Sequence, residues 1–544
     1  MENFCEKQMF FNYALIFSVL YKSVFSENKK ASKIAKQRFF VLKMLIYYAV
    51  FHFLIYLCCA KTIQTKQSTK MKPTFKKTTM LIMSFIVSAF AMTALADARL
   101  ITANPGENAS TEMRISWHTD VSMSNSFVKF TQVSDTNWEN ARRVPSEYYI
   151  SSTWYGVPVR LRTDGEIERI FQNFNVKRHR AVLSNLTPGT KYKYQIGLSV
   201  DFRNIIGQVF TEFIGESAIE TVADFNWSAY STMFSDVRHF QTAGASEFTF
   251  AWISDIHLWQ PLPQRLNNAM DMISTLIEQA PNGIDFIFST GDMLAFGGCY
   301  GEWETLFNQP HLRNNMFVSL IGNHDVYQDG RITPEYHKQE FFTHTHNFPP
   351  NGYAGQEGAS YWFKYGNVLW IVLNSMDLRN ESQVPIAKEW ASEVIRNNPA
   401  QYIFFAQHFQ WFNANGAPNA AGFTRWHEFF DKWGVDIAFS GNSHVYFRTY
   451  PLYNRQVSSD PRRGTVYIGA PSSDGGRGRY KLEMSAENAP KTAFRWTEGA
   501  NTVGGSLVTV NEREVTISLY NRYGVRQDHV VIPARRTIDG ELKR

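Results

Sequence analysis

The sequence predicts an all-β domain followed by a layered α/β domain. Two observations support this prediction. From Arg99 to about Thr242, short runs such as Met113–Trp117 alternate apolar and polar residues, with turn residues between the runs. From Phe248 onward, apolar strands alternate with amphipathic helices, which is typical of an α/β layered fold. The chain has 544 residues, of which 44% are hydrophobic, so it is long and apolar enough for more than one core.

The first domain, expected at 97–244, reads as a β-sandwich because its short strands are closely spaced along the chain. Trp117-His118-Thr119 ends an early strand, and the run L-S-N-L-T-P-G-T-K-Y-K-Y from Leu183 to Tyr194 leads through a turn into a later strand. Both features resemble a fibronectin-III-like domain. They look most similar to the N-terminal domain of purple acid phosphatases.

The second domain is expected at 245–535, with a short tail at 536–544. Six apolar runs predict buried strands: Phe248–Ser254, Ile284–Ser289, Met316–Ile321, Val368–Asn374, Tyr402–Ala406 and Val435–Ser440. Apolar residues at helical spacing predict two helices: Leu266, Ala269, Met270, Ile273 and Ile277 on the first, and Ile386, Trp390 and Val394 on the second, which starts near Pro385. Strand-like runs between 464 and 533 are expected to complete the sheets.

The first 96 residues resemble targeting material. They hold 14 Lys and Arg against 3 Glu, which leaves 41 basic and 46 acidic residues, a net charge of −5, in the remainder. This mildly acidic remainder carries no nucleic-acid footprint. Residues 71–96 have a lysine-rich start, an apolar stretch from Met80 to Phe90 and a cleavage motif ending at Ala96, which are the parts of a secretory signal peptide.

We therefore expect a secreted or periplasmic protein without stable membrane association, and we interpret 1–70 as an upstream extension from a misassigned start. The alternative is a membrane anchor through Met44–Ala60, a stretch at the lower limit for a span. Of four cysteines, only Cys299 lies after the cleavage motif, so no internal disulfide framework is expected.

Polar clusters follow five of the six predicted strands of the second domain directly. In chain order they are Ser254-Asp255-Ile256-His257, Gly291-Asp292, Gly322-Asn323-His324-Asp325, Gln407-His408 and Gly441-Asn442-Ser443-His444. Because active sites of α/β sheets lie beyond the carboxyl ends of the strands, we expect the five clusters to converge. Asp, His and Asn side chains are suitable ligands for divalent metals of intermediate hardness.

Taken together, these clusters resemble the signature of calcineurin-like metallophosphoesterases, D-x-H … G-D … G-N-H-[DE] … H … G-H-x-H, over roughly Phe248 to Tyr446. The resemblance implies a four-layer α/β/β/α domain with two divalent metal ions, of which Mn, Zn, Fe and Mg are candidates. It implies that a metal-bound hydroxide attacks phosphorus while a histidine assists the leaving alcohol.

The resemblance also implies roles for single residues. Asp255, His257 and His444 would hold the first metal, Asp292 would bridge both metals, and Asn323 and His408 would hold the second. His324 would assist the leaving group, and Asp325 would orient and charge-stabilise the imidazole of His324.

Two departures from the family patterns affect the expected metals. Purple acid phosphatases have D-x-G and G-D-x-x-Y, whereas this chain has His257 and Ala295 at the corresponding positions, so no Tyr–Fe(III) absorption band is expected. The first His of G-H-x-H is Asn442, a neutral and weaker ligand, so the second metal site is expected to be weaker. Arg448 could contact a substrate phosphate, although a structural ion pair is an equal alternative.

The leading hypothesis is therefore a metal-dependent phosphoesterase whose partner is a small phosphate monoester. One alternative is a phosphodiesterase that acts on nucleotides or lipid head groups. Another is a catalytically impaired binding module, because Asn442 replaces a ligand histidine. The sequence does not determine the oligomeric state.

Overall fold

The computed structural model describes residues 98–542, with gaps at 122, 124, 156–159, 162–166, 169–172, 200–231, 245–246, 329–332, 414–420, 461 and 479–483. The predicted extension 1–70, the signal peptide 71–96 and the alternative anchor Met44–Ala60 lie outside the described residues. Among the described helices, none has both the length and the apolar character that crossing a membrane requires.

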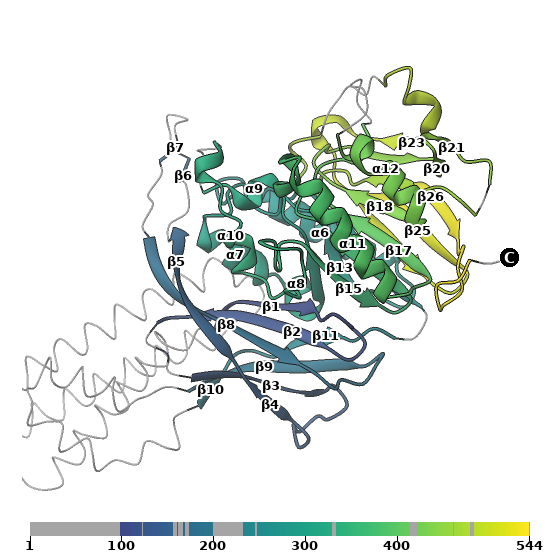
Figure 1. Ribbon diagram of the computed structural model, residues 1–544. Helices are drawn as coiled ribbons and strands as arrows, with labels where there is room; N and C mark the ends of the chain where they lie inside the picture. The colour runs from purple at the N-terminus through teal and green to yellow at the C-terminus, as the bar shows by residue number, and fades with distance from the viewer. Residues whose placement is uncertain are drawn as a thin grey trace, which may run out of the picture. The chain divides into compact units, whose positions relative to one another are not determined.

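The N-terminal domain consists of two antiparallel sheets (Figure 1). One sheet has the order β1 (Arg99–Pro105), β2 (Met113–Thr119), β8 (Asn173–Leu183) and β5 (Glu147–Tyr155). The other has the order β10 (Thr232–Phe234), β9 (Lys191–Ser199), β3 (Asn125–Gln132) and β4 (Arg142–Pro145), with β11 (Arg238–Gln241) also paired to β9. A small ribbon pairs β6 (Arg160–Leu161) with β7 (Ile167–Glu168).

Trp117 lies in the core of this domain. Its side chain is fully buried, and its indole N–H donates to Oγ of Ser126 on β3 at 2.9 Å. Apolar side chains from both sheets are buried with it: Met113, Ile115, Val128, Phe130, Leu183, Ile196 and Leu198. The predicted all-β domain is thus confirmed, whereas its fibronectin-III-like character stays a prediction.

The second domain contains two mixed sheets. The first has the order β14 (Met316–Ser319), β13 (Phe286–Ser289), β12 (Phe248–Ile253), β24 (Gly504–Val510), β25 (Glu514–Asn521) and β26 (Arg526–Pro533). The second has the order β15 (Tyr361–Tyr365), β16 (Val368–Val372), β17 (Tyr402–Ala406), β18 (Ile437–Ser440), β22 (Val466–Gly469), β19 (Tyr446–Thr449) and β23 (Thr492–Trp496). Strands β12 to β14 run parallel, as do β16, β17, β18 and β22, so each sheet has a common carboxyl edge.

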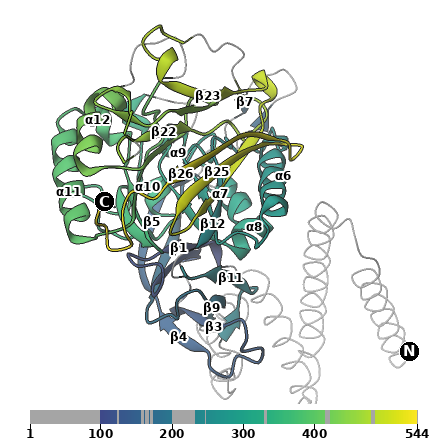
Figure 2. The same cartoon turned by 90° about the vertical axis from the view of Figure 1, so that its right-hand side faces the viewer.

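Aromatic side chains pack the two sheets face to face. The ring of Trp370 on β16 lies 5.4 Å from Phe250 and 5.1 Å from Phe288, and Phe439 on β18 lies 4.9 Å from Trp252. Helix α6 (Gln264–Gln279) covers the first sheet, whereas α11 (Gln383–Asn397) and α12 (Ala421–Trp433) lie on the opposite side (Figure 2). The predicted four layers, α/β/β/α, are therefore confirmed.

One predicted helix face was wrong. Helix α11 buries Val384, Ala387, Ala391 and Val394, which follow one another at spacings of three or four residues, whereas Ile386 is exposed. Because successive helical residues point about 100° apart, Ile386 falls outside the buried stripe.

Shorter elements complete the domain. They are α7 (Tyr300–Phe307), α8 (Pro310–Asn314), α9 (Asn323–Val326), α10 (Glu340–Thr343), β20 (Leu452–Tyr453), β21 (Gln456–Val457) and 3-10 turns at Pro334–Tyr336, Asp377–Arg379 (η4), Ala489–Lys491 and Gly499–Asn501. The segment 343–347, after α10, joins the two domains. Asn347 donates from Nδ2 to the carbonyls of Ile115 and Ala181, and Arg180 donates to the carbonyl of Thr343 at 2.8 Å.

Candidate metal centre

The predicted metal ligands converge beyond the carboxyl ends of the parallel strands. Asp255 and His257 follow β12, Asp292 follows β13, and His444 follows β18. The ligand atoms of these four buried side chains all lie within 4.8 Å of one another. His408, after β17, is fully buried beside them.

Asp292 occupies the middle of this cluster. Its Oδ2 lies 3.2 Å from Nε2 of His257 and 3.2 Å from Nε2 of His408. Nε2 of His444 lies 3.2 Å from Oδ1 of Asp255. One carboxylate placed between two imidazoles is the arrangement that the predicted bridging role of Asp292 requires.

Backbone carbonyls orient the three histidines of the cluster. Each ring places Nδ1 at a carbonyl oxygen: His257 at Asp255 (3.0 Å), His408 at Thr290 (2.8 Å) and His444 at Arg477 (2.9 Å). A carbonyl can only accept, so Nδ1 is the donor in each ring and Nε2 faces the cluster. Such outer contacts fix the tautomer that a metal-binding histidine needs.

The backbone is strained at these same positions. Among the described non-glycine residues, ten have positive φ, and five of them belong to this site: Asp255, His257, Asp292, Asn442 and His444. Such a conformation costs on the order of 1–3 kcal/mol per residue, so its concentration here points to a functional constraint. Gly322 permits the loops to approach, because a Cβ atom there would lie 2.2 Å from the backbone nitrogen of Asp292.

Buried polar atoms without partners show that the donor set fits metal ions. No described group donates to or accepts from Oδ1 of Asp255, Nε2 of His408 or Oδ1 of Asn323 in a hydrogen bond. Asn323 donates from Nδ2 to the hydroxyl of Tyr327 at 2.8 Å, which leaves the amide oxygen available. Buried polar atoms are normally paired, and carboxylate, imidazole and amide donors suit divalent cations.

Charge in the cluster favours a bound cation. Burial lowers the pKa of His408, but the Asp292 carboxylate outweighs burial and raises that pKa to about 9. Burial likewise raises the pKa of Asp292, but His408 and His324 outweigh it and hold the pKa well below its ordinary value. A metal ion would replace the proton that this cluster otherwise attracts.

His324 lies beside the cluster. Its ring lies 4.8 Å from that of His257, and its backbone N–H donates to Oδ1 of Asp292 at 2.9 Å. Nδ1 donates to the carbonyl of Ala295 at 3.0 Å, and Nε2 accepts from Nη1 of Arg477 at 3.1 Å. Burial lowers the pKa of His324 to about 4, so the imidazole is neutral and its Nε2 can accept a hydrogen bond from the Arg477 guanidinium.

Asp474 and Arg477 are site residues that sequence reasoning missed. Oδ2 of Asp474 lies 3.5 Å from Nδ1 of His257 and 3.8 Å from Nε of Arg265. Burial raises the pKa of Asp474, but its contact with His257 lowers it to about 2. The sequence held a signal: both residues lie in a polar run after β22, which is one of the strand-like runs predicted between 464 and 533, so the strand-end argument would have found them.

Two predicted site residues have other partners in the structure. The carboxylate of Asp325 does not contact the His324 ring, as its predicted orienting role required, because its two oxygens accept from four backbone N–H groups: those of Gly322, Asp292, Met293 and Leu294. Arg448 forms the structural ion pair that was the alternative to a substrate contact: Asp528 accepts from its Nε at 2.8 Å and from its Nη2 at 3.0 Å.

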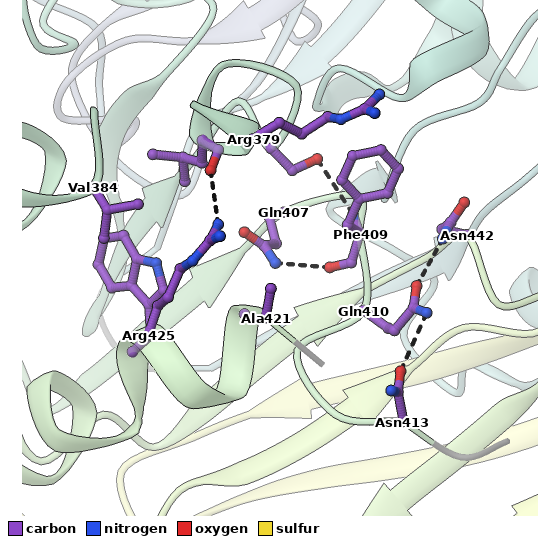
Figure 3. A pocket seen from close by; sticks show the side chains of 13 residues that line it. Arg379, Val384, Gln407, Phe409, Gln410, Asn413, Ala421, Arg425 and Asn442 are labelled. Carbon is purple, nitrogen blue, oxygen red and sulfur yellow. Dashed lines mark hydrogen bonds between the residues drawn. The ribbon is translucent and has the colours of Figure 1, made fainter. Parts of the chain in front are cut away.

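Asn442 lies at the edge of the cluster. Its backbone N–H donates to Oδ2 of Asp255 at 3.2 Å, and its Nδ2 donates to Oε1 of Gln410 at 2.7 Å (Figure 3). The side-chain oxygen points away from Gln410. A ligand role for this oxygen stays a prediction.

Comparisons with known proteins agree with this geometry. Residues 248–446 match the family model of calcineurin-like phosphoesterases, and residues 99–210 match that of the purple acid phosphatase N-terminal domain. The solved purple acid phosphatase PPD1 from yellow lupin (Lupinus luteus) seeds has the same fold, with a TM-score of 0.60 at 16% identity over 81% of this chain and 75% of that one.

Two curated plant relatives have names that indicate different activities. A probable inactive purple acid phosphatase 27 of Arabidopsis thaliana is 22% identical over 345 residues, 58% of this chain and 52% of the relative. A nucleotide pyrophosphatase/phosphodiesterase of Hordeum vulgare is 25% identical over 286 residues, 48% of this chain and 72% of the relative. The chain thus spans only about half the length of the Arabidopsis relative. We conclude that it carries a calcineurin-like phosphoesterase domain behind a purple acid phosphatase N-terminal domain.

Proposed function

We propose that this protein is a metal-dependent hydrolase of phosphate esters that prefers monoesters. The observation that carries the proposal is the position of Asp292, whose Oδ2 lies 3.2 Å from both His257 and His408, with His324 and Arg477 paired beside it. Asp255, His257 and His444 would hold one cation, and Asn323 and His408 the other. Bound metals would supply a nucleophile at neutral pH and neutralise charge on the transferring phosphoryl group.

The residues beside the cluster account for the preferred ester class. Ala295 holds Nδ1 of His324, so Nε2, which accepts from Arg477, is the ring nitrogen that could act on a leaving oxygen, as a proton donor only once it has itself taken up a proton. Arg477 contacts this same nitrogen and is placed to move onto a non-bridging oxygen of the substrate. A guanidinium there stabilises the dianion of a monoester more than the monoanion of a diester.

Two other functions have specific support. Hydrolysis of phosphodiesters is favoured by the name of the barley relative. A binding role without turnover is favoured by Asn442 and by the names of two Arabidopsis relatives, probable inactive purple acid phosphatases 27 and 24.

One assay separates the three functions. The purified protein is stripped of metal, reloaded with Mn²⁺, Zn²⁺, Mg²⁺ or Fe²⁺, and tested on p-nitrophenyl phosphate and bis-p-nitrophenyl phosphate. We expect metal-dependent turnover, faster on the monoester and lost in Asp292→Asn and His324→Ala. Faster turnover of the diester would favour a phosphodiesterase. A folded, metal-loaded protein without turnover would favour the binding role.

We further propose that the protein is secreted or periplasmic, on the strength of the signal-like residues 71–96. Amino-terminal sequencing of the protein recovered from its host tests this. A chain that starts at Asp97 supports export, and a chain that retains Met44–Ala60 supports a membrane anchor.

A further inference from the structure

A pocket of about 400 Å³ adjoins the candidate metal centre (Figure 3). Gln407 and Phe409, which flank His408 in the chain, line it, and so does Asn442. Its other walls come from η4, from the residues after β17 and from the start of α12. This volume lies within the range of small-molecule sites, and its walls meet the cluster on the side of the predicted second metal.

One positive charge on this pocket has no counter-charge among the described residues. Arg425 lines the pocket but is held by the carboxylate of Glu381 and by the carbonyl of Leu378. Arg379 also lines it, and it makes no hydrogen bond or ion pair with any residue that the structure describes. The nearby carboxylate of Asp377 accepts from the hydroxyl of Tyr353 at 2.8 Å.

Neutral amides form the wall between the pocket and the metal centre. Gln410 donates from Nε2 to Asn413 at 3.3 Å and accepts from Asn442 at 2.7 Å, and Gln407 donates to the carbonyl of Phe409 at 2.8 Å (Figure 3). These bonds hold the amides in place. The pocket therefore combines a fixed, polar, uncharged wall with one guanidinium, that of Arg379, with which no described carboxylate pairs.

Tyr327 lies between the predicted ligand Asn323 and the predicted acid His324. Its hydroxyl accepts from Nδ2 of Asn323 at 2.8 Å, and its ring lies 5.0 Å from that of His324. Because Arg379 lines the same pocket as Asn442 and the chain neighbours of His408, a leaving group whose oxygen meets His324 can extend into this pocket toward Arg379.

We propose that this pocket receives the leaving group and that Arg379 selects leaving groups that carry an anionic substituent, a carboxylate or a second phosphate. This inference rests on the proposed phosphoesterase function and specifies its substrate class. Carboxylates and phosphates pair well with a guanidinium, and the amide wall offers hydrogen bonds to the rest of the leaving group.

Matched aryl phosphates test the proposal. The protein loaded with Mn²⁺ is assayed on 4-carboxyphenyl phosphate and on 4-carbamoylphenyl phosphate, which is similar in size but neutral on the ring. We expect kcat/KM to favour the carboxylate and Arg379→Gln to reduce that preference about fivefold, the scale of a partly exposed ion pair. Arg396→Gln, which removes an exposed charge from α11, should leave the preference unchanged.

A second substrate pair distinguishes the two anions. Hydrolysis of ADP releases the anion AMP, whereas hydrolysis of AMP releases neutral adenosine. A preference for ADP that falls in Arg379→Gln would assign a phosphate. A change confined to the aryl pair would assign a carboxylate.

A binding measurement separates this proposal from the proposed function. Calorimetry on the unmodified protein should give a Kd for 4-hydroxybenzoate that is about fivefold weaker in Arg379→Gln and unchanged for 4-hydroxybenzamide. If neither Kd nor substrate preference responds to Arg379→Gln in a protein that hydrolyses phenyl phosphate, the pocket proposal is wrong and the phosphoesterase stands. Selective binding without any turnover would support the pocket and contradict the enzyme.

Discussion

At the scale of single residues, Arg477 is the side chain whose substitution has the clearest expected effect on catalysis. Its guanidinium lies 3.1 Å from Nε2 of His324 and is placed to stabilise charge on the phosphoryl group. We expect Arg477→Gln to lower kcat/KM for p-nitrophenyl phosphate by about 10²-fold, the usual cost of one electrostatic donor, and Arg477→Lys to retain part of the activity.

Inhibition by inorganic phosphate shows whether Arg477 acts on substrate or only on His324. If the guanidinium contacts phosphate, the inhibition constant should rise in Arg477→Gln and stay constant in the exposed control Arg526→Gln. A normal inhibition constant together with a reduced kcat would mean that Arg477 only positions His324.

Asn442 permits a gain-of-function prediction. An imidazole is a stronger ligand than an amide for Zn²⁺, so Asn442→His should tighten binding of the second cation by roughly tenfold or more. The backbone should accept histidine, because His444 adopts the same left-handed conformation two residues later. Calorimetric titration with metal measures the affinity for the second cation, with Asn442→Ala as the control. Equal second-site affinity in all three proteins would place Asn442 outside the metal centre.

At the scale of elements, Asp325 joins α9 to the loop that follows β13. Its carboxylate accepts from the N-cap of α9 at Gly322 and from three consecutive N–H groups after β13. In Asp325→Asn, one oxygen becomes an NH₂ group that faces donors. Because buried hydrogen bonds to a charged group are lost, we expect the free energy of unfolding to fall by about 3 kcal/mol, and metal binding to weaken with it.

Chemical denaturation and metal titration of Asp325→Asn measure both effects. The control is Asp377→Asn, which makes the same change at a carboxylate on η4. Normal stability with a reduced kcat alone would restore the role that the sequence suggested for Asp325, the orientation of His324.

The same elements show what could be predicted from the sequence. The ends of strands could be predicted because apolar runs stop where polar clusters begin, and β17 lies where it was predicted, at Tyr402–Ala406. The direction of a side chain could not be predicted. Asp325 adjoins His324 in the chain, but neighbours on a helical turn point about 100° apart. Arg448 is paired with Asp528, 80 residues later in the chain, and no local sequence pattern predicts so distant a partner.

At the scale of the whole molecule, the segment 343–347 joins the two domains, and two buried histidines, His118 and His346, lie at or beside this junction. His118 of β2 contacts the carbonyl of His344 at 2.7 Å through Nε2, and Nδ1 of His344 lies 3.0 Å from Oγ of Ser151. His346 is enclosed by aromatic rings: Trp303, Phe307, Phe317, Phe342 and Phe348. Thr345, His346 and Asn347 of this segment are buried.

This interface should make the protein sensitive to acid. Burial lowers the pKa of His118 and of His346 to about 3, so both stay neutral in the folded protein. In the unfolded chain a histidine binds a proton near pH 6.5. Above pH 6.5 both histidines are neutral in both states, so they cause no pH dependence there. As pH falls from 6.5 toward 3, protonation of each histidine in the unfolded chain lowers the free energy of unfolding by roughly 1.4 kcal/mol per pH unit. Thermal unfolding should show a stability loss between pH 7 and 5.

His346→Gln tests the source of that loss, because glutamine can keep polar contacts with Ser319 and Thr345 but cannot take up the proton. The variant should be less stable at pH 8, where it forfeits ring packing, yet its stability should fall by about 2 kcal/mol less than that of the unsubstituted protein between pH 7 and 5. The exposed His529→Gln is the matched control. If His346→Gln keeps the full acid-induced loss, proton uptake by His346 is not its cause, and the loss between pH 7 and 5 must come from other histidines whose pKa burial lowers, such as His118, His179 and His344.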